Sequence, residues 1–196
     1  MVQQVKKISS FGATANRFDN VLYDTLNLEP GTESYQFFTT PRSNAKPEGF
    51  TNMSPGGQLA EGIDFIVAAI GLRIFCLEQQ TTDWFRLLNN AMSTATATFN
   101  MTGKQDLGLW PLSMWLDTIN SGVTPITAGD GDQITTQGSS LNWVALNRPI
   151  AIASKVQFDM DLKFYESLPA GLTGPDVENP ITRIKLILRG TMYRKK

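Results

Sequence analysis

One stretch of ten residues constrains this chain more than any other. Residues 156–165 read VQFDMDLKFY, in which apolar and other side chains alternate without a break. A period of two is typical of a β-strand with one face in a core and the other in water or against a partner. At about 3.3 Å per residue such a strand would span roughly 33 Å, the full height of a small β-sandwich. A helix would scatter the same apolar residues around its circumference.

Other segments also have strand-like patterns, and long, irregular loops separate them. Residues 63–77 form a nearly continuous apolar run, which predicts a central strand covered on both faces. Residues 84–92 have the spacing of a short amphipathic helix. Further strands are predicted at residues 21–28, 35–39, 94–101, 141–146, 149–153 and 181–194, and loops at residues 41–62, 120–140 and 167–180.

This arrangement predicts an all-β protein, a single jelly-roll β-sandwich of about eight strands with one short helix and long loops. Two packed sheets with crossing connections fit the loops better than an up-and-down barrel, which would need shorter and more regular turns. Residues 1–20 are polar and show neither the period of two of a strand nor the 3.6-residue period of a helix. We therefore expect an N-terminal arm followed by one domain over residues 21–196. A chain of 196 residues can build a core without disulfides, and its one cysteine allows none within the chain.

The charges are segregated along the chain. The net charge is −1, yet the first 18 residues carry +3 and the last 16 carry +6, so residues between them carry −10. Basic ends on an acidic body indicate either solvated tails or contacts with a polyanion. The C-terminal strand is the only candidate footprint for nucleic acid, and the pattern favours loose contact over sequence-specific recognition.

The composition excludes most catalytic chemistry. The chain contains no histidine, which removes Ser-His-Asp and Cys-His catalysis and the commonest zinc ligand. It also contains no glycine-rich phosphate-binding motif. We therefore expect no enzymatic activity, no cofactor and no metal.

Two pairs of carboxylates remain as candidate sites. Asp159 and Asp161 lie two residues apart on one predicted strand face. This placement fits a glycosidase pair, a calcium site, or a polar stripe that faces solvent or a partner. Glycosidase carboxylates normally come from different strands around a cleft, so the stripe is favoured. Asp130 and Asp132 flank a glycine, but the other ligands of an EF-hand loop are missing, so we interpret them as a loop tip.

A tryptophan-containing segment has two interpretations. Residues 107–119 read LGLWPLSMWLDTI, and Pro111 argues against a central strand. The segment forms either a corner of the core or an aromatic-rich contact between subunits, and the sequence leaves both open. With the basic ends, it supplies the candidate assembly contacts: Lys6, Lys7, Phe11, Trp110, Trp115, Arg189, Arg194, Lys195 and Lys196.

Two segments resemble the jelly-roll coat proteins of tailless icosahedral bacteriophages, including those that contain a membrane. The first is TNM at 51–53, followed by GQL at 57–59 and FIV at 65–67, and it is similar to their passage from a loop into a long buried strand. The second runs from RPI at 148–150 to LILRGTMYR at 186–194, and it is similar to their last two strands. Many of those proteins stack two jelly rolls in one chain, whereas this length allows one.

The resemblance implies a virion structural protein, either the self-assembling major coat protein of the shell or a vertex protein. Its partners would be further copies of itself, other virion proteins and, on the inside, the genome or lipid headgroups. The N-terminal residues lack the apolar core of a signal peptide, so we expect a capsid protein assembled in the host cytoplasm. The alternatives are a phage spike or carbohydrate-binding β-sandwich and, less favoured, a β-sandwich hydrolase that uses carboxylates.

Overall fold

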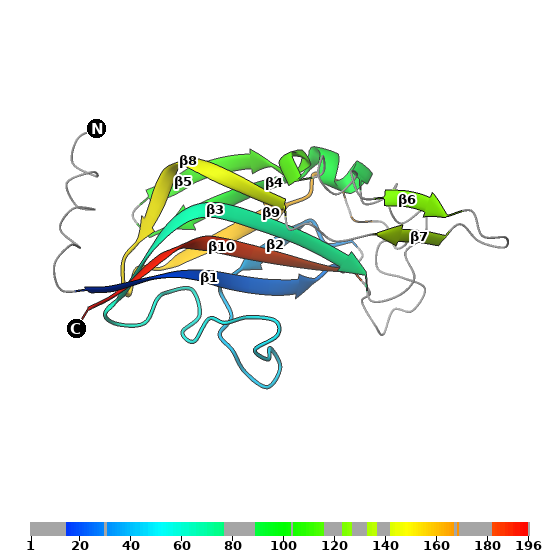
Figure 1. Ribbon diagram of the computed structural model, residues 1–196. Helices are drawn as coiled ribbons and strands as arrows, with labels where there is room; N and C mark the ends of the chain where they lie inside the picture. The colour runs from blue at the N-terminus through cyan, green and yellow to red at the C-terminus, as the bar shows by residue number, and fades with distance from the viewer. Residues whose placement is uncertain are drawn as a thin grey trace.

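The computed structural model is built almost entirely of β-strands (Figure 1). It describes residues 15–29, 31–76, 89–102, 104–115, 123–126, 133–136, 142–166, 168 and 182–195. The strands are β1 (Ala15–Asn27), β2 (Ser34–Phe37), β3 (Ile63–Cys76), β4 (Thr96–Met101), β5 (Lys104–Pro111), β6 (Val123–Ile126), β7 (Gln133–Thr136), β8 (Asn142–Ile152), β9 (Phe158–Lys163) and β10 (Thr182–Lys195). A short 3-10 helix, η1 (Leu112–Trp115), follows β5, and residues 89–94 are α-helical.

Eight of these strands form two four-stranded antiparallel sheets. One has the order β1-β10-β3-β8 and the other the order β2-β9-β4-β5. We call them the β10 sheet and the β9 sheet. In Figure 1 the β10 sheet faces the viewer and the β9 sheet lies behind it. The prediction of an all-β sandwich of about eight strands with a short helix is confirmed.

The strand pairs are nested along the chain. β4 pairs with β5, β3 with β8, β2 with β9, and β1 with β10, so the first strand meets the last and the innermost two form a hairpin. Contacts of β10 with β3 and of β9 with β4 then join these four pairs into the two sheets. The connections therefore cross between layers, which explains the long loops in the sequence.

Two predicted regions have a different structure. The predicted 120–140 loop contains β6 and β7, which pair as a separate two-stranded sheet. The two short strands predicted at 141–146 and 149–153 form one strand, β8, whose pairing with β3 is interrupted between Ala145 and Ile150. Arg148 and Pro149 lie in that interruption and are exposed, as expected for a proline on an edge strand, where no ladder hydrogen bond is required.

The alternation that defines residues 156–165 is confirmed, although the strand itself is shorter. β9 comprises Phe158–Lys163, in which Phe158, Met160 and Leu162 are buried against the other sheet. Phe164 extends the buried series, and its N–H donates to the carbonyl of Glu33 rather than to a ladder partner. The alternation of buried and outward side chains therefore continues beyond the last ladder pair of β9.

β1 begins earlier than the sequence predicted, at Ala15. Its residues 15–20 belonged to the predicted N-terminal arm, but they pair with the end of β10 in an unbroken register, Ala15 opposite Lys195. This backbone pairing offsets the absence of an apolar pattern in that stretch. The remainder of the predicted arm lies outside the described residues. Both ends of the described chain consequently lie together at one end of the sandwich (Figure 1).

β3 is central in its sheet, between β10 and β8, but Ala68 and Arg73 on this strand are exposed. Phe65 and Val67 point inward on one side of a register shift, and Ile70 and Leu72 on the other, while Ala68 at the shift is exposed. A β-bulge inserts one residue and so keeps the apolar set on the core side after an uneven spacing. Within the described residues, the continuous apolar run therefore reflects a bulge plus small outward residues, Ala68, Ala69 and Gly71.

The same bulge depends on a glycine in the neighbouring strand. The β10–β3 register shifts between Arg189 and Gly190. A Cβ at position 190 would overlap the carbonyl oxygen of Ile66 and approach the Cα of Val67 to 3.0 Å. Since both are backbone atoms of a central strand, neither can move without disturbing the ladder.

We expect Gly190→Ala to lower the free energy of unfolding by about 3 kcal/mol or more, at the upper end of overpacking effects. The matched control is Gly49→Ala, because a Cβ there meets nothing within 4 Å, and its effect should stay within about 0.5 kcal/mol. Urea denaturation of both variants measures the difference. Equal stability of the two would contradict this account of the bulge.

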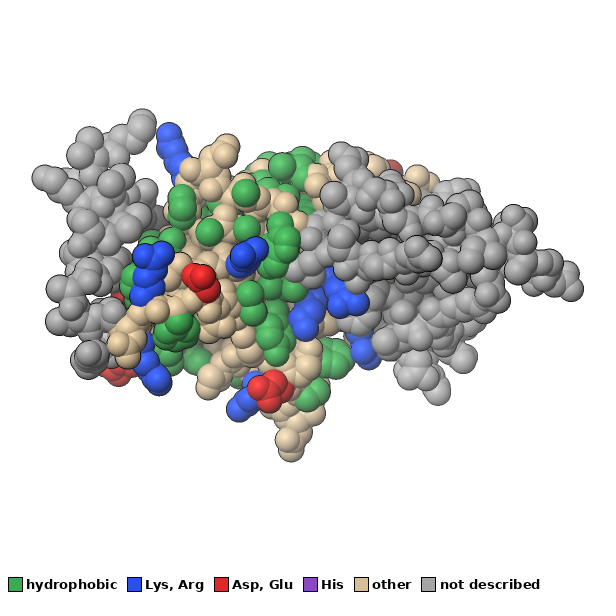
Figure 2. Space-filling model, viewed as in Figure 1, with side chains coloured by type: hydrophobic (Ala, Val, Ile, Leu, Met, Phe, Trp, Pro, Cys, Tyr) green, Lys and Arg blue, Asp and Glu red, His purple; other side chains and the backbone are tan. Residues whose placement is uncertain are grey.

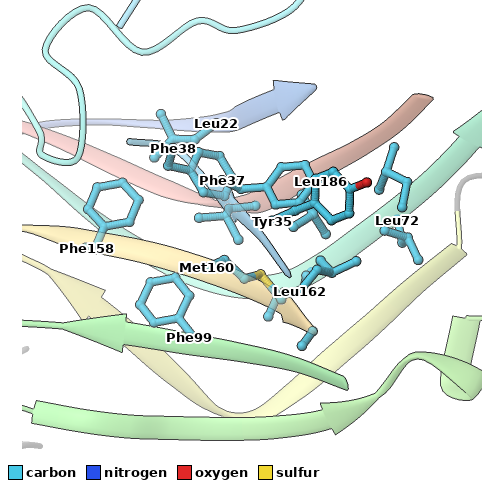
Figure 3. Close-up of a cluster of buried hydrophobic side chains, with 14 of the residues drawn as sticks. Leu22, Tyr35, Phe37, Phe38, Leu72, Phe99, Phe158, Met160, Leu162 and Leu186 are labelled. Atoms are coloured by element: carbon cyan, nitrogen blue, oxygen red, sulfur yellow. The ribbon is translucent and has the colours of Figure 1, made fainter. Parts of the chain in front are cut away.

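The core between the sheets is rich in aromatic side chains (Figure 3). Phe158 lies between Phe38 and Phe99, with ring centroids 5.8 and 6.0 Å away. Tyr35 packs edge-on to Phe164 at 6.0 Å, and its hydroxyl accepts from the backbone N–H of Glu29 at 2.7 Å. Burying such rings is among the largest apolar contributions available to a domain of this size.

The long loop at residues 41–62 is confirmed, and it lies along the outer edge of β1. We call its residues 46–53 the strap. The Asn52 side chain donates to the carbonyl of Val21 and accepts from the N–H of Tyr23, and Thr51 forms an isolated bridge with Asp24. These contacts occupy backbone groups that an edge strand would otherwise present to another chain.

Candidate functional site

The carboxylates of β9 form a polar cluster on the outer face of the β9 sheet. Asp159 and Asp161 point away from the core, and one side-chain amide, Asn100 of β4, donates to both of them at 2.8 Å. Asn100 stands directly opposite Asp159 in the ladder. The amide thus separates two like charges that would otherwise repel each other across one strand face.

This arrangement does not favour the catalytic or metal-binding interpretations. Both carboxylates come from one strand, whereas glycosidase pairs flank a scissile bond from two sides. Within the described ranges, no group of three or more histidine, cysteine, aspartate or glutamate side chains has the proximity to hold a metal ion. Asp130 and Asp132 lie outside the described residues. Asp159 and Asp161 therefore fit the predicted polar stripe.

Burial raises the pKa of the Asp159 carboxyl above its ordinary value; the Asn100 hydrogen bond partly opposes this, and the charge of Asp161 adds to it. Because the folded-state pKa is the higher one, ionisation of Asp159 costs stability at neutral pH, and this cost vanishes below about pH 3.9.

Asp159→Asn, whose amide oxygen still accepts from Asn100, should therefore raise the melting temperature at pH 7 and leave it unchanged near pH 3. The gain should be less than about 1 kcal/mol, since the site is only partly buried. Calorimetry at the two pH values measures it, and an equal shift at both would argue against the ionisation as its cause.

The outer face of the β10 sheet has the opposite character. Arg183, Lys185 and Arg189 alternate outward along β10, while Ile184, Leu186 and Leu188 of the same strand are buried, as the sequence predicted. Arg73 of β3 lies directly opposite Lys185 and is exposed. We call Arg73, Arg183, Lys185 and Arg189 the basic cluster. Figure 2 shows this face, on which Lys and Arg side chains surround a hydrophobic strip.

Aromatic rings hold three members of the basic cluster in place. The Lys185 ammonium lies 4.0 Å from the centroid of the Tyr23 ring, and the Arg183 guanidinium lies 4.7 Å from that of Phe50 in the strap. The Arg189 guanidinium lies 5.8 Å from the ring of Trp143 on β8. A ring positions a cation without cancelling its charge, as a carboxylate would.

Lys185, the one lysine of the basic cluster, is half-buried. It donates to the carbonyl of Gly49 at 3.3 Å. Burial lowers the pKa of Lys185, and repulsion from Arg73 lowers it further. Like charges directly opposite each other in a sheet are destabilising. A bound anion would therefore reduce the repulsion between Lys185 and Arg73.

The structure corrects one predicted assembly contact, Trp115. Its side chain is fully buried, and its indole Nε1 donates to the carbonyl of Ile70 at 3.3 Å. Of the two interpretations of residues 107–119, the core corner is the one that applies to Trp115. β5 ends at Pro111 and η1 turns the chain inward, so Trp115 points at β3.

The other predicted contacts have different environments. Trp110 is half-buried and packs against the core, and its ring occupies the space above Gly108, where a Cβ would overlap it. Arg189 and Arg194 are exposed on β10. Lys195 pairs with Ala15 through its backbone, but its side chain is not described. Lys6, Lys7, Phe11 and Lys196 lie outside the described residues.

The sequence reasoning missed the aromatic partners of the basic cluster. Tyr23, Phe50 and Trp143 come from three separate segments, and only the strand order places them beside β10. The alternation of residues 181–194 indicated which side chains would point outward, but no local pattern indicates cross-strand neighbours.

No family model matches this chain, and no curated protein matches it. In the part of the chain that the structure describes, no helix is both long enough and apolar enough to cross a membrane.

Proposed function

We propose that this protein is a structural protein of an icosahedral virion, a single jelly roll that self-assembles into the shell as its major coat protein. The observation that carries the proposal is the nested pairing of eight strands. First-with-last pairing, rolled into two four-stranded sheets, is the arrangement expected of a jelly roll, a double-sheet fold common among viral capsid proteins.

The segments that resemble phage coat proteins occupy consistent places in this fold. TNM at 51–53 belongs to the strap, which covers the edge of β1 before the chain enters β3. RPI at 148–150 lies at the pairing interruption of β8, and LILRGTMYR at 186–194 supplies most of β10. The first segment therefore leads from the strap into β3 of the β10 sheet, and the second passes through β8, β9 and β10 and contributes to both sheets, which supports treating them as parts of one architecture.

Self-association is the next element of the proposal. Leu109 is 64% exposed on the edge strand β5 and Met114 is 48% exposed in the adjoining η1. Exposed apolar side chains on a strand at the edge of a sheet are typical of surfaces that meet another chain. The partners are further copies of this chain and other virion proteins.

Sedimentation of the purified full chain tests this step. We expect discrete species larger than the 21.6 kDa protomer, with Leu109→Ser weakening them while the circular dichroism of the sandwich is retained. A protein that sediments only as a monomer across the accessible concentration range would contradict self-association.

We further propose that both termini face the inside of the shell. The support is their adjacency, since Ala15 pairs with Lys195 and both chain ends leave the same end of the sandwich. The two terminal segments carry +3 and +6, and phosphates of a genome or of lipid headgroups would compensate that charge.

Changing Arg194, Lys195 and Lys196 to Gln should leave the isolated protein folded and make particle yield or internal attachment sensitive to salt. Protease access to residues 1–18 in intact particles measures the orientation directly. Cleavage there without disruption of the particle would place this end outside and overturn the orientation.

A further inference from the structure

We propose that the outer face of the β10 sheet binds single-stranded nucleic acid, with the basic cluster contacting phosphates and Trp143 stacking on a base. The inference rests on the proposed function for the source of the nucleic acid, an encapsidated genome. It concerns a different surface from the chain termini and is testable without shell assembly.

The first observation is the charge of this face. Four cations from two neighbouring strands, Arg73, Arg183, Lys185 and Arg189, point to the same side of the sheet. Among the described residues, the acids on the outward side of these strands are Asp19 and Asp64, which stand at the other end of the face, near the chain termini. Glu48 of the strap is paired with Arg42 at 3.5 Å. Cations therefore outnumber acids among the described side chains around the basic cluster, which favours attraction of a polyanion.

The second observation is the spacing of charge along one strand. β10 carries the cluster residues at positions 183, 185 and 189, which span roughly 20 Å at the rise of a β-strand. An extended strand of nucleic acid that follows β10 over this length would place its phosphates above these cations.

The third observation is the placement of the aromatic rings. Trp143 is 36% exposed on the edge strand β8, next to the guanidinium of Arg189. A basic track with an accessible ring beside it is the combination that single-strand binders use, because every base has a face that stacks. A duplex would keep its bases inside and gain nothing from this ring.

A membrane surface fits the same face less well. Peripheral membrane proteins bury large apolar side chains below the headgroups. The outward residues between the cations are small or only partly exposed, for example Ala69, Gly71 and Ile187. The exposed large side chains Leu109 and Met114 belong to β5 and η1 rather than to the β10 sheet. Phe18 of β1 stands opposite the buried Met192, so among the described large hydrophobic residues Trp143 is the exposed one on this face.

The test is fluorescence anisotropy of a labelled oligothymidylate of roughly 30 nucleotides with the purified full chain, titrated at several salt concentrations. The cluster variant is Arg73→Gln/Arg189→Gln. The matched control is Lys155→Gln/Lys163→Gln, which removes the same charge from residues that contact Glu61 and Tyr165 instead.

We expect the cluster variant to bind roughly tenfold or more weakly at about 0.1 M salt, and the slope of log K against log salt to fall by about 1.4, or 0.7 per lost phosphate contact. The control should match the wild type in both. Trp143→Ala should weaken binding at least about fivefold with the slope unchanged, and Trp143→Phe should restore most of it.

Several results would overturn the inference: no binding by the wild type, equal losses in the cluster and control variants, or tighter binding of a duplex of the same length. Binding to vesicles containing phosphatidylserine, but not to the oligonucleotide, would assign the face to a membrane instead. Shell assembly is scored separately by sedimentation, so loss of nucleic-acid binding with intact oligomers refutes this inference alone.

Discussion

Replacing Lys46 by methionine is expected to destabilise the protein by about 3–5 kcal/mol, because it leaves a carboxylate buried without its cation. The Lys46 ammonium lies 2.7 and 2.8 Å from the two carboxylate oxygens of Asp24. Asp24 is fully buried and Lys46 is 8% exposed. This ion pair anchors the start of the strap against the inner side of β1.

The double variant Asp24→Asn/Lys46→Met separates the charge effect from the loss of packing. One oxygen of Asp24 also accepts from the backbone N–H of Phe38 at 2.7 Å, and an asparagine oxygen can keep that bond. We therefore expect the double variant to recover to within about 2 kcal/mol of the wild type. Chemical denaturation measures all three proteins. A double variant that is no more stable than Lys46→Met would show that the charge is not the cause.

Replacing Trp115 by alanine should cost about 3–5 kcal/mol of folding free energy, the range for large aromatic side chains in a core. The ring is fully buried and its N–H is bonded to the backbone of Ile70 in the central strand β3. The loss should therefore appear in the unfolding of the monomer, before any effect on assembly.

The matched control is Trp143→Ala, the same substitution at a ring that is 36% exposed on an edge strand. We expect it to cost about 1 kcal/mol or less, the range for surface positions. Denaturation midpoints and slopes of the two variants supply the comparison. If Trp115→Ala abolished oligomers while the monomer kept its stability, the residue would be a subunit contact after all.

The two tryptophans of residues 107–119 show why a local pattern could not settle their roles. Trp110 and Trp115 are five residues apart, but a strand ends and a 3-10 turn begins between them. The direction of Trp115 depends on where that change occurs, and the position of β3 beneath it depends on the strand order. Neither is encoded within the segment.

The period of two predicted far more of the fold than of the candidate site. It correctly predicted that Phe158, Met160 and Leu162 of β9 point into the core, and it correctly predicted which residues of β10 point inward and outward. Each strand face is a local property, because successive side chains point to opposite sides. The β3 run was misread because a bulge at Ala68 breaks the period and imitates a strand buried on both faces.

The candidate site required long-range information. The pairing of Asn100 with Asp159 and Asp161 joins residues about sixty positions apart, and the opposition of Lys185 and Arg73 spans more than a hundred. Lys46 lies in the long 41–62 loop, and no local pattern linked it to Asp24 of β1. Charge counts along the chain indicated a basic C-terminal strand, but only the sheet order gathers the cations and rings into one face.

Electron microscopy of the purified, concentrated protein tests the central claim most directly. If this chain is a self-assembling coat protein, it should form capsomers or closed shells of uniform diameter, alone or with its virion partners, with residues 1–18 protected from protease in the closed particles. Uniform monomers under every assembly condition, or open fibres that never close, would contradict the account.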